Sequence, residues 1–440
     1  MNTLFENKKI TLLGLGVLGR GVGDAKFLAK AGAKLTITDL KTSTELKTSL
    51  EKLKKFSNIS YTLGKHKPSD FNNKDLIIKC AGVPLDSIYI KEARINKIPI
   101  KMSTAIFAKQ TAAKLIGITG TRGKSTVTHL IYHILKTAGI KAHLGGNVKG
   151  VSTLSLLNKV KKNEYVILEL DSWQLQGFGE DKISPQISVF TNFMPDHLNY
   201  YKGDMQRYLM DKINIFKYQQ PNDTLITNKA TLKIIKKEYK FKINSKILEV
   251  ENVLSRTNLW KKNLLGSHNL MNIAMAVQVG EEIGISENMI KKAISTFAGV
   301  PGRLELVKNI NGIRYYNDTT STIPEATMAA INALENKRII LIAGGNDKNL
   351  EYKKLANIIS TKVNKLILLP GSATKKITDS LPKKYKYIVT ESMEGAVKEA
   401  SLSAKKGDIV LLSPGAASFG LFINEFDRGY RFCKYINKIS

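Results

Sequence analysis

The residues best suited to chemistry lie in a glycine-rich segment, 120–126 (GTRGKST), between two apolar runs. The run before it, 115–118, predicts a buried strand, and residues 127–135 carry apolar side chains at helical spacing. Glycines let backbone N–H groups turn toward phosphate oxygens, and a following helix adds its positive end. We therefore predict a loop that binds a nucleoside triphosphate, with Lys124 on the outer phosphates and Ser125 on magnesium. Because Ile118 stands where the common pattern has its first glycine, an ordinary strand–turn–helix is the alternative.

Two further candidates follow predicted strands of the same region. Glu169 is the only acid in the apolar run 165–170, where a carboxylate is costly unless it is paired or binds a cation. His197 comes just after the strand 187–191. We predict that both serve a magnesium site, with a capped structural acid and a structural histidine as the alternatives.

Other polar residues stand at turns or helix starts and are ambiguous by themselves. Asn147 fits a plain turn, Lys212 fits an exposed helix face, and residues 268–272 open an apolar helix that they could simply cap. Three charged residues stand at turns or strand ends in the last third of the chain: Arg303, Asp318 and Lys348. Each could contact a ligand or form a structural salt bridge, and the sequence favours neither.

The N-terminal region has the spacing of a dinucleotide-type βαβ unit. A strand at 9–13 leads into Gly14, Gly16 and Gly19, a helix runs through Lys30, and a second strand, 34–38, ends at Asp39. An acid about 20 residues after the glycines is typical of this unit. The spacing leaves open whether the ligand is NAD, another nucleotide or none.

The elements that must position these residues alternate between strand and helix, which predicts an α/β protein with parallel sheets covered by helices on both faces. Three such units fit 440 residues. We place them at 1–102, 103–300 and 301–440, the last boundary falling at the breakers of 299–302. The other predicted strands are 76–79, 99–102, 224–227, 313–316, 338–343, 365–369 and 408–412.

Composition narrows the class of protein. A hydrophobic content of 43% fits a soluble globular chain, and no apolar run approaches the roughly 18 residues of a membrane span. Residues 1–9 are polar, so we expect no signal peptide. Two cysteines are too few for a disulfide framework and lack metal-ligand spacing. We expect a cytoplasmic protein that does not insert into membranes.

The net charge of +31 raises the question of a nucleic-acid partner. Only ten of the 68 basic residues are arginine, and the lysines are scattered along the chain. Arginine is the residue that reads bases and phosphates with paired hydrogen bonds. We therefore interpret the lysines as solvated faces and expect no nucleic acid, with a polyanion partner as the alternative.

The order of these motifs resembles that of the Mur ligases. The segments that carry the resemblance are 120–126, 145–147, 169–174, 192–197, 268–272, 301–303, 317–318 and 412–418. Residues 14–19 and 413–429 are most similar to the members that join D-glutamate to UDP-N-acetylmuramoyl-L-alanine. The resemblance covers essentially the whole chain. It implies an N-terminal Rossmann-like domain for UDP, a central P-loop ATPase-type domain for ATP, and a C-terminal Rossmann-like domain for the amino acid.

The resemblance also assigns roles to residues. ATP would contact Gly120, Thr121, Arg122, Gly123, Lys124, Ser125, Thr126, Asn272, Arg303 and Asp318. One magnesium ion would lie on Ser125 and Glu169, a second on His197 and a carbamylated Lys212, and Asn147 would face the transferred phosphate. The UDP-substrate would contact Val17, Leu18, Asp39, Leu40, Lys41 and Gly82. Glutamate would contact Lys348, Ser418 and Phe422, with Phe426 as an alternative aromatic.

The implied reaction is the formation of an amide in cell-wall synthesis. ATP phosphorylates the alanyl carboxylate, and the amine of glutamate then attacks the acyl phosphate. Thr320 stands where the family commonly has lysine, so the choice between D- and L-glutamate stays open. The alternatives are a sibling ligase with a different amino acid, a folylpolyglutamate-type ligase, and a basic P-loop ATPase that binds nucleic acid. We expect a monomer.

Overall fold

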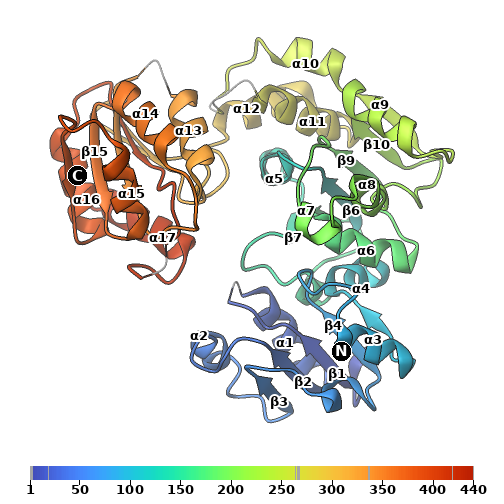
Figure 1. Ribbon diagram of the computed structural model, residues 1–440. Helices are drawn as coiled ribbons and strands as arrows, with labels where there is room; N and C mark the ends of the chain where they lie inside the picture. The colour runs from blue at the N-terminus through green and yellow to red at the C-terminus, as the bar shows by residue number, and fades with distance from the viewer. Residues whose placement is uncertain are drawn as a thin grey trace. The chain divides into compact units, whose positions relative to one another are not determined.

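The computed structural model describes residues 3–17, 19–262, 264, 268–334, 337–418 and 420–439. These residues form three sheets (Figure 1). The chain divides into two compact units, one made of residues up to 261 with 268–294, and the other containing the residues from 295 onward. The first unit holds two of the sheets and the second unit holds the third. This is the three-sheet α/β architecture that the strand–helix alternation predicts.

The N-terminal sheet has five parallel strands in the order β3-β2-β1-β4-β5. Its core lies on both faces, against α1 on one side and against α3 on the other. The order reverses direction between β1 and β4, which creates a crevice at the carboxyl ends of these strands. The elements are β1 Lys9–Leu13, α1 Arg20–Lys30, β2 Lys34–Asp39, α2 Lys47–Glu51, β3 Ile59–Leu63, β4 Leu76–Lys79, α3 Ile88–Ile95 and β5 Ile100–Lys101, with 3-10 turns at Thr3–Phe5 and Pro68–Phe71.

The central sheet has six parallel strands in the order β11-β10-β9-β6-β8-β7. Helices α4, α6, α8 and α9 pack on one core, and α11 packs against α5. The strands are β6 Lys114–Thr119, β7 Ala142–Gly146, β8 Tyr165–Glu169, β9 Ile187–Phe190, β10 Thr224–Thr227 and β11 Lys246–Glu249. The helices are α4 Ser103–Gln110, α5 Lys124–Thr137, α6 Ser172–Asp181, α7 Leu198–Tyr201, α8 Met205–Ile213, α9 Lys229–Glu238, α10 Glu251–Thr257, α11 His268–Glu282 and α12 Glu287–Thr296, with a 3-10 turn at Leu154–Asn158.

The third sheet has six strands in the order β12-β13-β17-β14-β15-β16, and alternate residues of its strands face two separate cores. Helices α13 to α15 cover one face, and α16 and α17 cover the other. The elements are β12 Glu305–Ile310, β13 Ile313–Asn317, α13 Pro324–Ala333, β14 Ile339–Gly344, α14 Lys353–Lys362, β15 Lys365–Leu369, α15 Ser372–Ser380, β16 Tyr387–Val389, α16 Met393–Ser403, β17 Ile409–Leu412 and α17 Glu425–Asn437.

The expectation of purely parallel sheets is wrong at one edge. β12 pairs with β13 antiparallel, because the two strands are joined by a tight turn at Asn311 and Gly312, both with positive φ. The sequence analysis also missed β3, β7, β11, β12 and β16. Four of these are sheet-edge strands with partly exposed residues, so they lack the continuous apolar run of a central strand. β7 contains two glycines and also lies at an edge.

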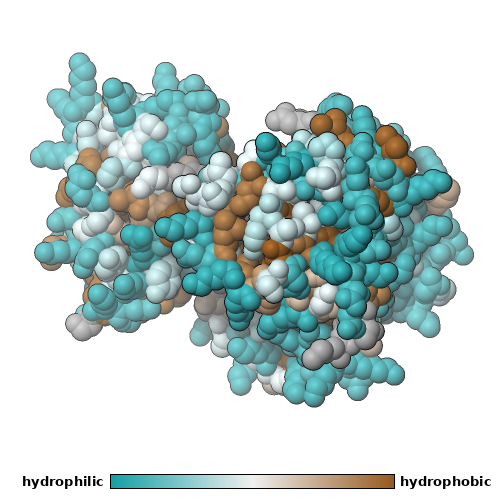
Figure 2. Space-filling view, turned by 90° about the horizontal axis from the view of Figure 1, so that it is seen from below, coloured by the Kyte–Doolittle hydropathy of each residue, from teal (hydrophilic) through white to brown (hydrophobic). Residues whose placement is uncertain are grey.

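Hydrophilic side chains cover most of the face drawn in Figure 2, and apolar groups are scattered among them. Within the described ranges, no helix combines the length and apolarity that crossing a bilayer requires. Cys80 and Cys433 are both free thiols.

Candidate functional site

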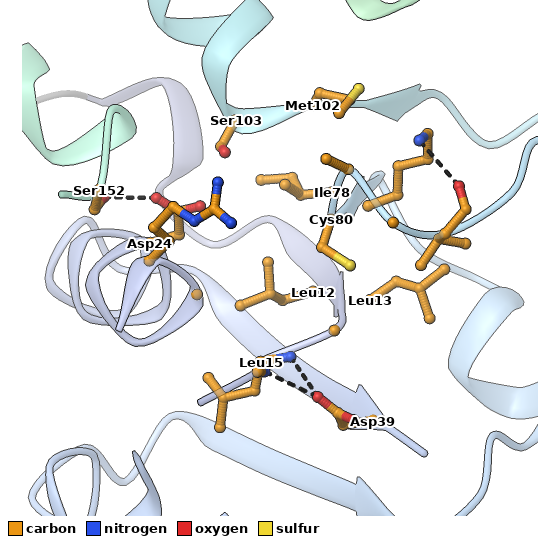
Figure 3. A pocket seen from close by; sticks show the side chains of 18 of the residues that line it. Leu12, Leu13, Leu15, Asp24, Asp39, Ile78, Cys80, Met102, Ser103 and Ser152 are labelled. Carbon is orange, nitrogen blue, oxygen red and sulfur yellow. Dashed lines mark hydrogen bonds between the residues drawn. The ribbon is translucent and has the colours of Figure 1, made fainter. Parts of the chain in front are cut away.

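A pocket of about 490 Å³ opens at the crevice of the N-terminal sheet (Figure 3). It is lined by the carboxyl ends of β1, β2 and β4, by the glycine turn after β1, and by residues 102–104 and 151–153 of the central region. Ligands of open α/β sheets bind at such a switch point. The pocket therefore lies where the βαβ spacing predicts a nucleotide site.

Asp39 ends β2 and fixes the glycine turn. Its Oδ2 accepts hydrogen bonds from the backbone N–H of Leu15 at 2.8 Å and of Gly16 at 3.0 Å, as the dashed lines of Figure 3 show. Its Oδ1 accepts a third from the N–H of Lys41 at 2.9 Å. Both oxygens are thus engaged by the protein backbone, an arrangement different from an acid that is free to bind a ribose.

Four other residues assigned to the UDP-substrate line the same pocket. Val17 and Leu40 are exposed there, at 47% and 66%, although they are large and apolar. Lys41 and Gly82 also line it. Leu18 lies outside the described residues. Exposed apolar groups at a pocket are suited to packing against a nucleobase.

Two hydrogen bonds join α1 to the central region beside this pocket. The Arg20 Nη1 donates to Asn147 Oδ1 at 2.5 Å, and the Ser152 hydroxyl donates to Asp24 Oδ1 at 2.5 Å. Burial raises the pKa of Asp24 to about 6, against the opposing effect of its hydrogen bonds with Ser152 and Ser103. The N–H of Asn147 donates to the Glu169 carbonyl at 2.7 Å, so Asn147 connects α1 with the end of β8.

The phosphate loop joins β6 to α5, as the sequence predicts. Gly120 has φ 137° and Gly123, the N-cap of α5, has φ 84°, and both values favour glycine. A Cβ on Gly120 would lie 1.9 Å from the Thr191 hydroxyl oxygen. The segment after β9 braces the loop, because the Thr191 hydroxyl donates to the Arg122 carbonyl at 2.6 Å and the N–H of Thr121 donates to the Asn192 carbonyl at 2.9 Å.

Two lysines meet at the same loop carbonyl. Lys124 Nζ donates to the Gly120 carbonyl at 2.9 Å, and Lys212 Nζ donates to it at 2.8 Å. Lys212 is only 1% exposed, so the expectation of a surface lysine from its position alone is wrong. Burial, and secondarily the charge of Lys124, lower the pKa of Lys212 to about 7. The Lys212 amine is therefore part neutral near pH 7.

Glu169 ends β8, next to β6 in the sheet, and is 5% exposed. No hydrogen bond from a residue within the described ranges reaches its carboxylate. A buried carboxylate without a donor fits a cation ligand. Ser125, in the first turn of α5, is also buried. One hydroxyl, one carboxylate and phosphate oxygens form a donor set that Mg²⁺ accepts.

His197 lies beside Trp173, with ring centroids 4.8 Å apart, and its backbone φ is 53°. Burial lowers its pKa, so the imidazole is neutral at pH 7 and has a nitrogen lone pair available. Across the described ranges, no three His, Cys, Asp or Glu side chains form a cluster suited to a metal. An ion beside His197 would therefore need ligands of other kinds, such as phosphate oxygens, water or a modified side chain.

Asn272, in the second turn of α11, lies against the phosphate loop. A Cβ added to Gly123 would come 2.3 Å from Asn272 Oδ1, and Asn272 Nδ2 donates to Asn269 Oδ1 at 2.9 Å. Arg122 is exposed at the loop, and Thr126 follows Ser125 in α5. The structure therefore brings together the central residues of the predicted site: the loop, Asn147, Glu169, Lys212 and Asn272.

In the second unit, Asp318 follows β13 and is buried. Its Oδ2 accepts hydrogen bonds from the hydroxyls of Ser321 at 2.6 Å and Ser413 at 2.7 Å. Burial raises its pKa to about 6. Arg303 is exposed and close enough to Asp318 to interact with its charge.

The residues assigned to glutamate differ in their exposure to solvent. Lys348 is exposed and its Nζ donates to the Thr322 hydroxyl at 2.9 Å, whereas Ser418 is buried beyond β17. Phe422 is 7% exposed and belongs to the core beneath α16 and α17. A ring packed in a core has little surface left for a ligand, so its assigned role stays a prediction.

Sequence reasoning missed two arginines. Arg428 in α17 is fully buried and donates to the Thr319 and Ala416 carbonyls at 2.8 and 3.1 Å, so it joins the loops after β13 and β17. Arg20 lines the pocket of the N-terminal sheet. The composition could have drawn attention to them, because only ten of the 68 basic residues are arginine.

Comparison with known protein families gives three matches that together span most of the chain. Residues 8–101 match the Mur ligase MurD-like N-terminal domain, residues 118–280 match the Mur ligase middle domain, and residues 302–415 match the Mur ligase glutamate ligase domain.

Curated relatives agree over the full length. The chain is 37% identical to UDP-N-acetylmuramoylalanine–D-glutamate ligase of Borreliella burgdorferi, with 99% of each chain covered. It is 34% identical to the enzyme of the same name from Roseiflexus sp. (strain RS-1), with 98% of this chain and 99% of the relative covered.

Solved structures support the fold. UDP-N-acetylmuramate–alanine ligase from Thermotoga maritima superposes with a TM-score of 0.60 at 18% identity, over 99% of this chain and all of the other. The MurF ligase of Thermotoga maritima superposes with a TM-score of 0.55 at 17% identity, over 100% of this chain and 97% of the other.

Proposed function

This chain belongs to the Mur ligase family, and we propose that it joins D-glutamate to UDP-N-acetylmuramoyl-L-alanine while ATP is cleaved to ADP and phosphate. This reaction forms an amide in the synthesis of the peptidoglycan precursor. Identity of 37% and 34% over nearly the whole length, to two enzymes named for this reaction, supports the choice among the Mur ligases. We further propose domain boundaries at 1–102, 103–300 and 301–440.

The observation that carries the proposal is the meeting of Lys124 and Lys212 on the Gly120 carbonyl inside the phosphate loop. A glycine-rich loop with the Lys124 ammonium beside it is suited to the oxygens of a nucleoside triphosphate, and the buried Lys212 amine at the same carbonyl is suited to modification. We assign the phosphates to residues 120–126 and the adenine side to Asn272. Arg303 and Asp318 are assigned to the phosphates and ribose by resemblance.

Magnesium fits the donors of the central domain. Ser125 and Glu169 would hold one ion, and His197 with a carbamylated Lys212 would hold another. When bound, such ions neutralise the charge that develops on the transferred phosphoryl group. A lysine amine must lose its proton before it adds to CO2, and the burial of Lys212 favours that state. The adduct is a carboxylate-like anion, so the modification changes a cation into a metal ligand.

The proposed reaction has two steps. The alanyl carboxylate attacks the γ-phosphorus, the bond to the β-γ bridging oxygen breaks, and ADP leaves. Lys124 and Asn147 would stabilise and orient the transferred group. The amine of glutamate attacks the acyl phosphate, the tetrahedral intermediate expels phosphate, and the ammonium proton is released. Lys348 and Ser418 are the residues we assign to the glutamate carboxylates.

The test is product formation from purified protein with ATP, Mg²⁺, UDP-N-acetylmuramoyl-L-alanine and either D- or L-glutamate. We expect a product heavier by one glutamyl residue with D-glutamate, and ADP in equal amount. A clear preference for L-glutamate would assign the chain to a sibling activity. ATP turnover that ignores both substrates and rises with added RNA would contradict the proposal.

A further inference from the structure

Arg20 is a cation in the pocket of the N-terminal sheet that neither the motifs nor the resemblance assigns to a ligand. It is the first residue of α1 and follows Gly19, the N-cap, whose φ is 86°. Its side chain lines the pocket together with the glycine turn and residues 39–41. A guanidinium presents several donors in one plane, which matches the geometry of phosphate oxygens better than an ammonium does.

Part of the glycine turn is already engaged by hydrogen bonds within the protein. In related β-α-β units the turn binds a pyrophosphate close to its backbone and to the helix N-terminus. Here the N–H groups of Leu15 and Gly16 both donate to Asp39. These two N–H groups are therefore not available to a ligand phosphate, and a side-chain donor would add to the N–H groups at the start of α1.

The charges that line the pocket favour Arg20 for this role. Lys79 Nζ donates to the Val83 carbonyl at 3.2 Å, and Lys41 lies 3.8 Å from Glu45. Arg20, in contrast, donates to the neutral Asn147 side chain; its charge lowers the pKa of Asp24, but within the described ranges no acid lies at salt-bridge distance from it.

The two acids of the pocket are engaged by the protein. Asp39 is held by three N–H groups, and Asp24, one helical turn after Arg20, is held by Ser152. Burial raises the pKa of Asp24 to about 6, so Asp24 is still mostly charged at pH 7 and an anionic ligand must lie on the Arg20 side of the pocket.

We propose that Arg20 binds the pyrophosphate of the UDP-substrate and thereby selects a nucleoside diphosphate over the nucleoside. This rests on the proposed function. The guanidinium nitrogens that do not face Asn147 donate to the phosphate oxygens. Because the N–H of Asn147 donates to the Glu169 carbonyl, the same side chain links the occupied pocket to the end of β8.

Calorimetric titration with UDP and with uridine tests this assignment without requiring turnover. Replacement of Arg20 by alanine (Arg20→Ala) is expected to weaken UDP binding by about 10- to 100-fold, the effect of losing hydrogen bonds to a charged group. Uridine binding should not change, because uridine lacks the phosphates. The UDP affinity of Arg20→Lys should lie between those of the wild type and Arg20→Ala, since lysine keeps the charge but loses the planar set of donors.

Arg94→Ala is the matched control, because Arg94 is an exposed arginine of the same sheet domain that donates to the Leu85 carbonyl. It should bind both ligands as the wild type does. Unchanged UDP affinity in Arg20→Ala, or equal weakening of UDP and uridine, would overturn the assignment. A wild-type protein that binds neither ligand would contradict the proposed function itself, and the assignment with it.

Discussion

The Lys124→Ala variant is expected to lose activity by about 100- to 1,000-fold in kcat, the effect of removing one group that stabilises developing charge. Lys124 is the first residue of α5, and its Nζ donates hydrogen bonds to the Gly120 and Thr121 carbonyls at 2.9 and 3.0 Å. Negative charge increases on the transferred phosphoryl group as its bond to ADP breaks, and alanine offers no cation to it. The measurement is the steady-state rate of ADP formation with all substrates saturating.

Lys136→Ala provides the control for this variant, because Lys136 is exposed in the last turn of the same helix. It should keep the wild-type kcat, and both variants should melt near the wild-type temperature. A Lys124→Ala enzyme with the kcat of the Lys136→Ala enzyme would refute the assignment of residues 120–126 to the triphosphate.

Lys212→Ala is expected to lose about 100-fold or more in kcat, for a different reason. If the amine carries a carbamate, its removal deletes a metal ligand. Added bicarbonate then has no amine to modify and cannot restore activity. Acetate, a small carboxylate that fits the vacated space, should restore part of it. A lysine that only braces the Gly120 carbonyl would give a variant that acetate does not rescue.

The carbamate also predicts a dependence on pH. Its formation consumes the neutral amine and releases a proton, so loading increases with pH. With a pKa of about 7, the amine is about one-tenth neutral at pH 6 and about nine-tenths neutral at pH 8. Protein stripped of CO2 should therefore regain activity with bicarbonate at pH 8 and regain little at pH 6.

A carbamate carbon signal from ¹³C-bicarbonate should appear in the wild type and in Lys217→Ala, an exposed-lysine control, but not in Lys212→Ala. Absence of this signal from a fully active wild-type enzyme would contradict the carbamylation of Lys212.

The sequence predicted most of the central strands and the phosphate loop, because buried parallel strands are continuous apolar runs and glycines mark the turn. It could not predict the burial of Lys212, since that depends on α8 packing beside a loop some ninety residues earlier in the chain. Helical spacing alone places such a lysine on a surface; the resemblance supplied what the spacing lacked.

Edge strands and contacts across the sheets were harder to predict for a related reason. The antiparallel edge strand β12 is partly exposed over most of its length, and its pairing is set by the turn to β13. Arg20 was missed because its partner, Asn147, lies in another sheet domain. Interactions of this kind depend on how distant segments pack, so local sequence patterns do not predict them.

The central claim is that ATP activates the alanyl carboxylate of the UDP-substrate. It can be tested with substrate that carries ¹⁸O in both carboxylate oxygens, by mass spectrometry of the phosphate released in the complete reaction. If the carboxylate attacks the γ-phosphorus, one ¹⁸O appears in each phosphate and the other remains in the new amide. Phosphate whose extra oxygen comes from water instead would contradict this account.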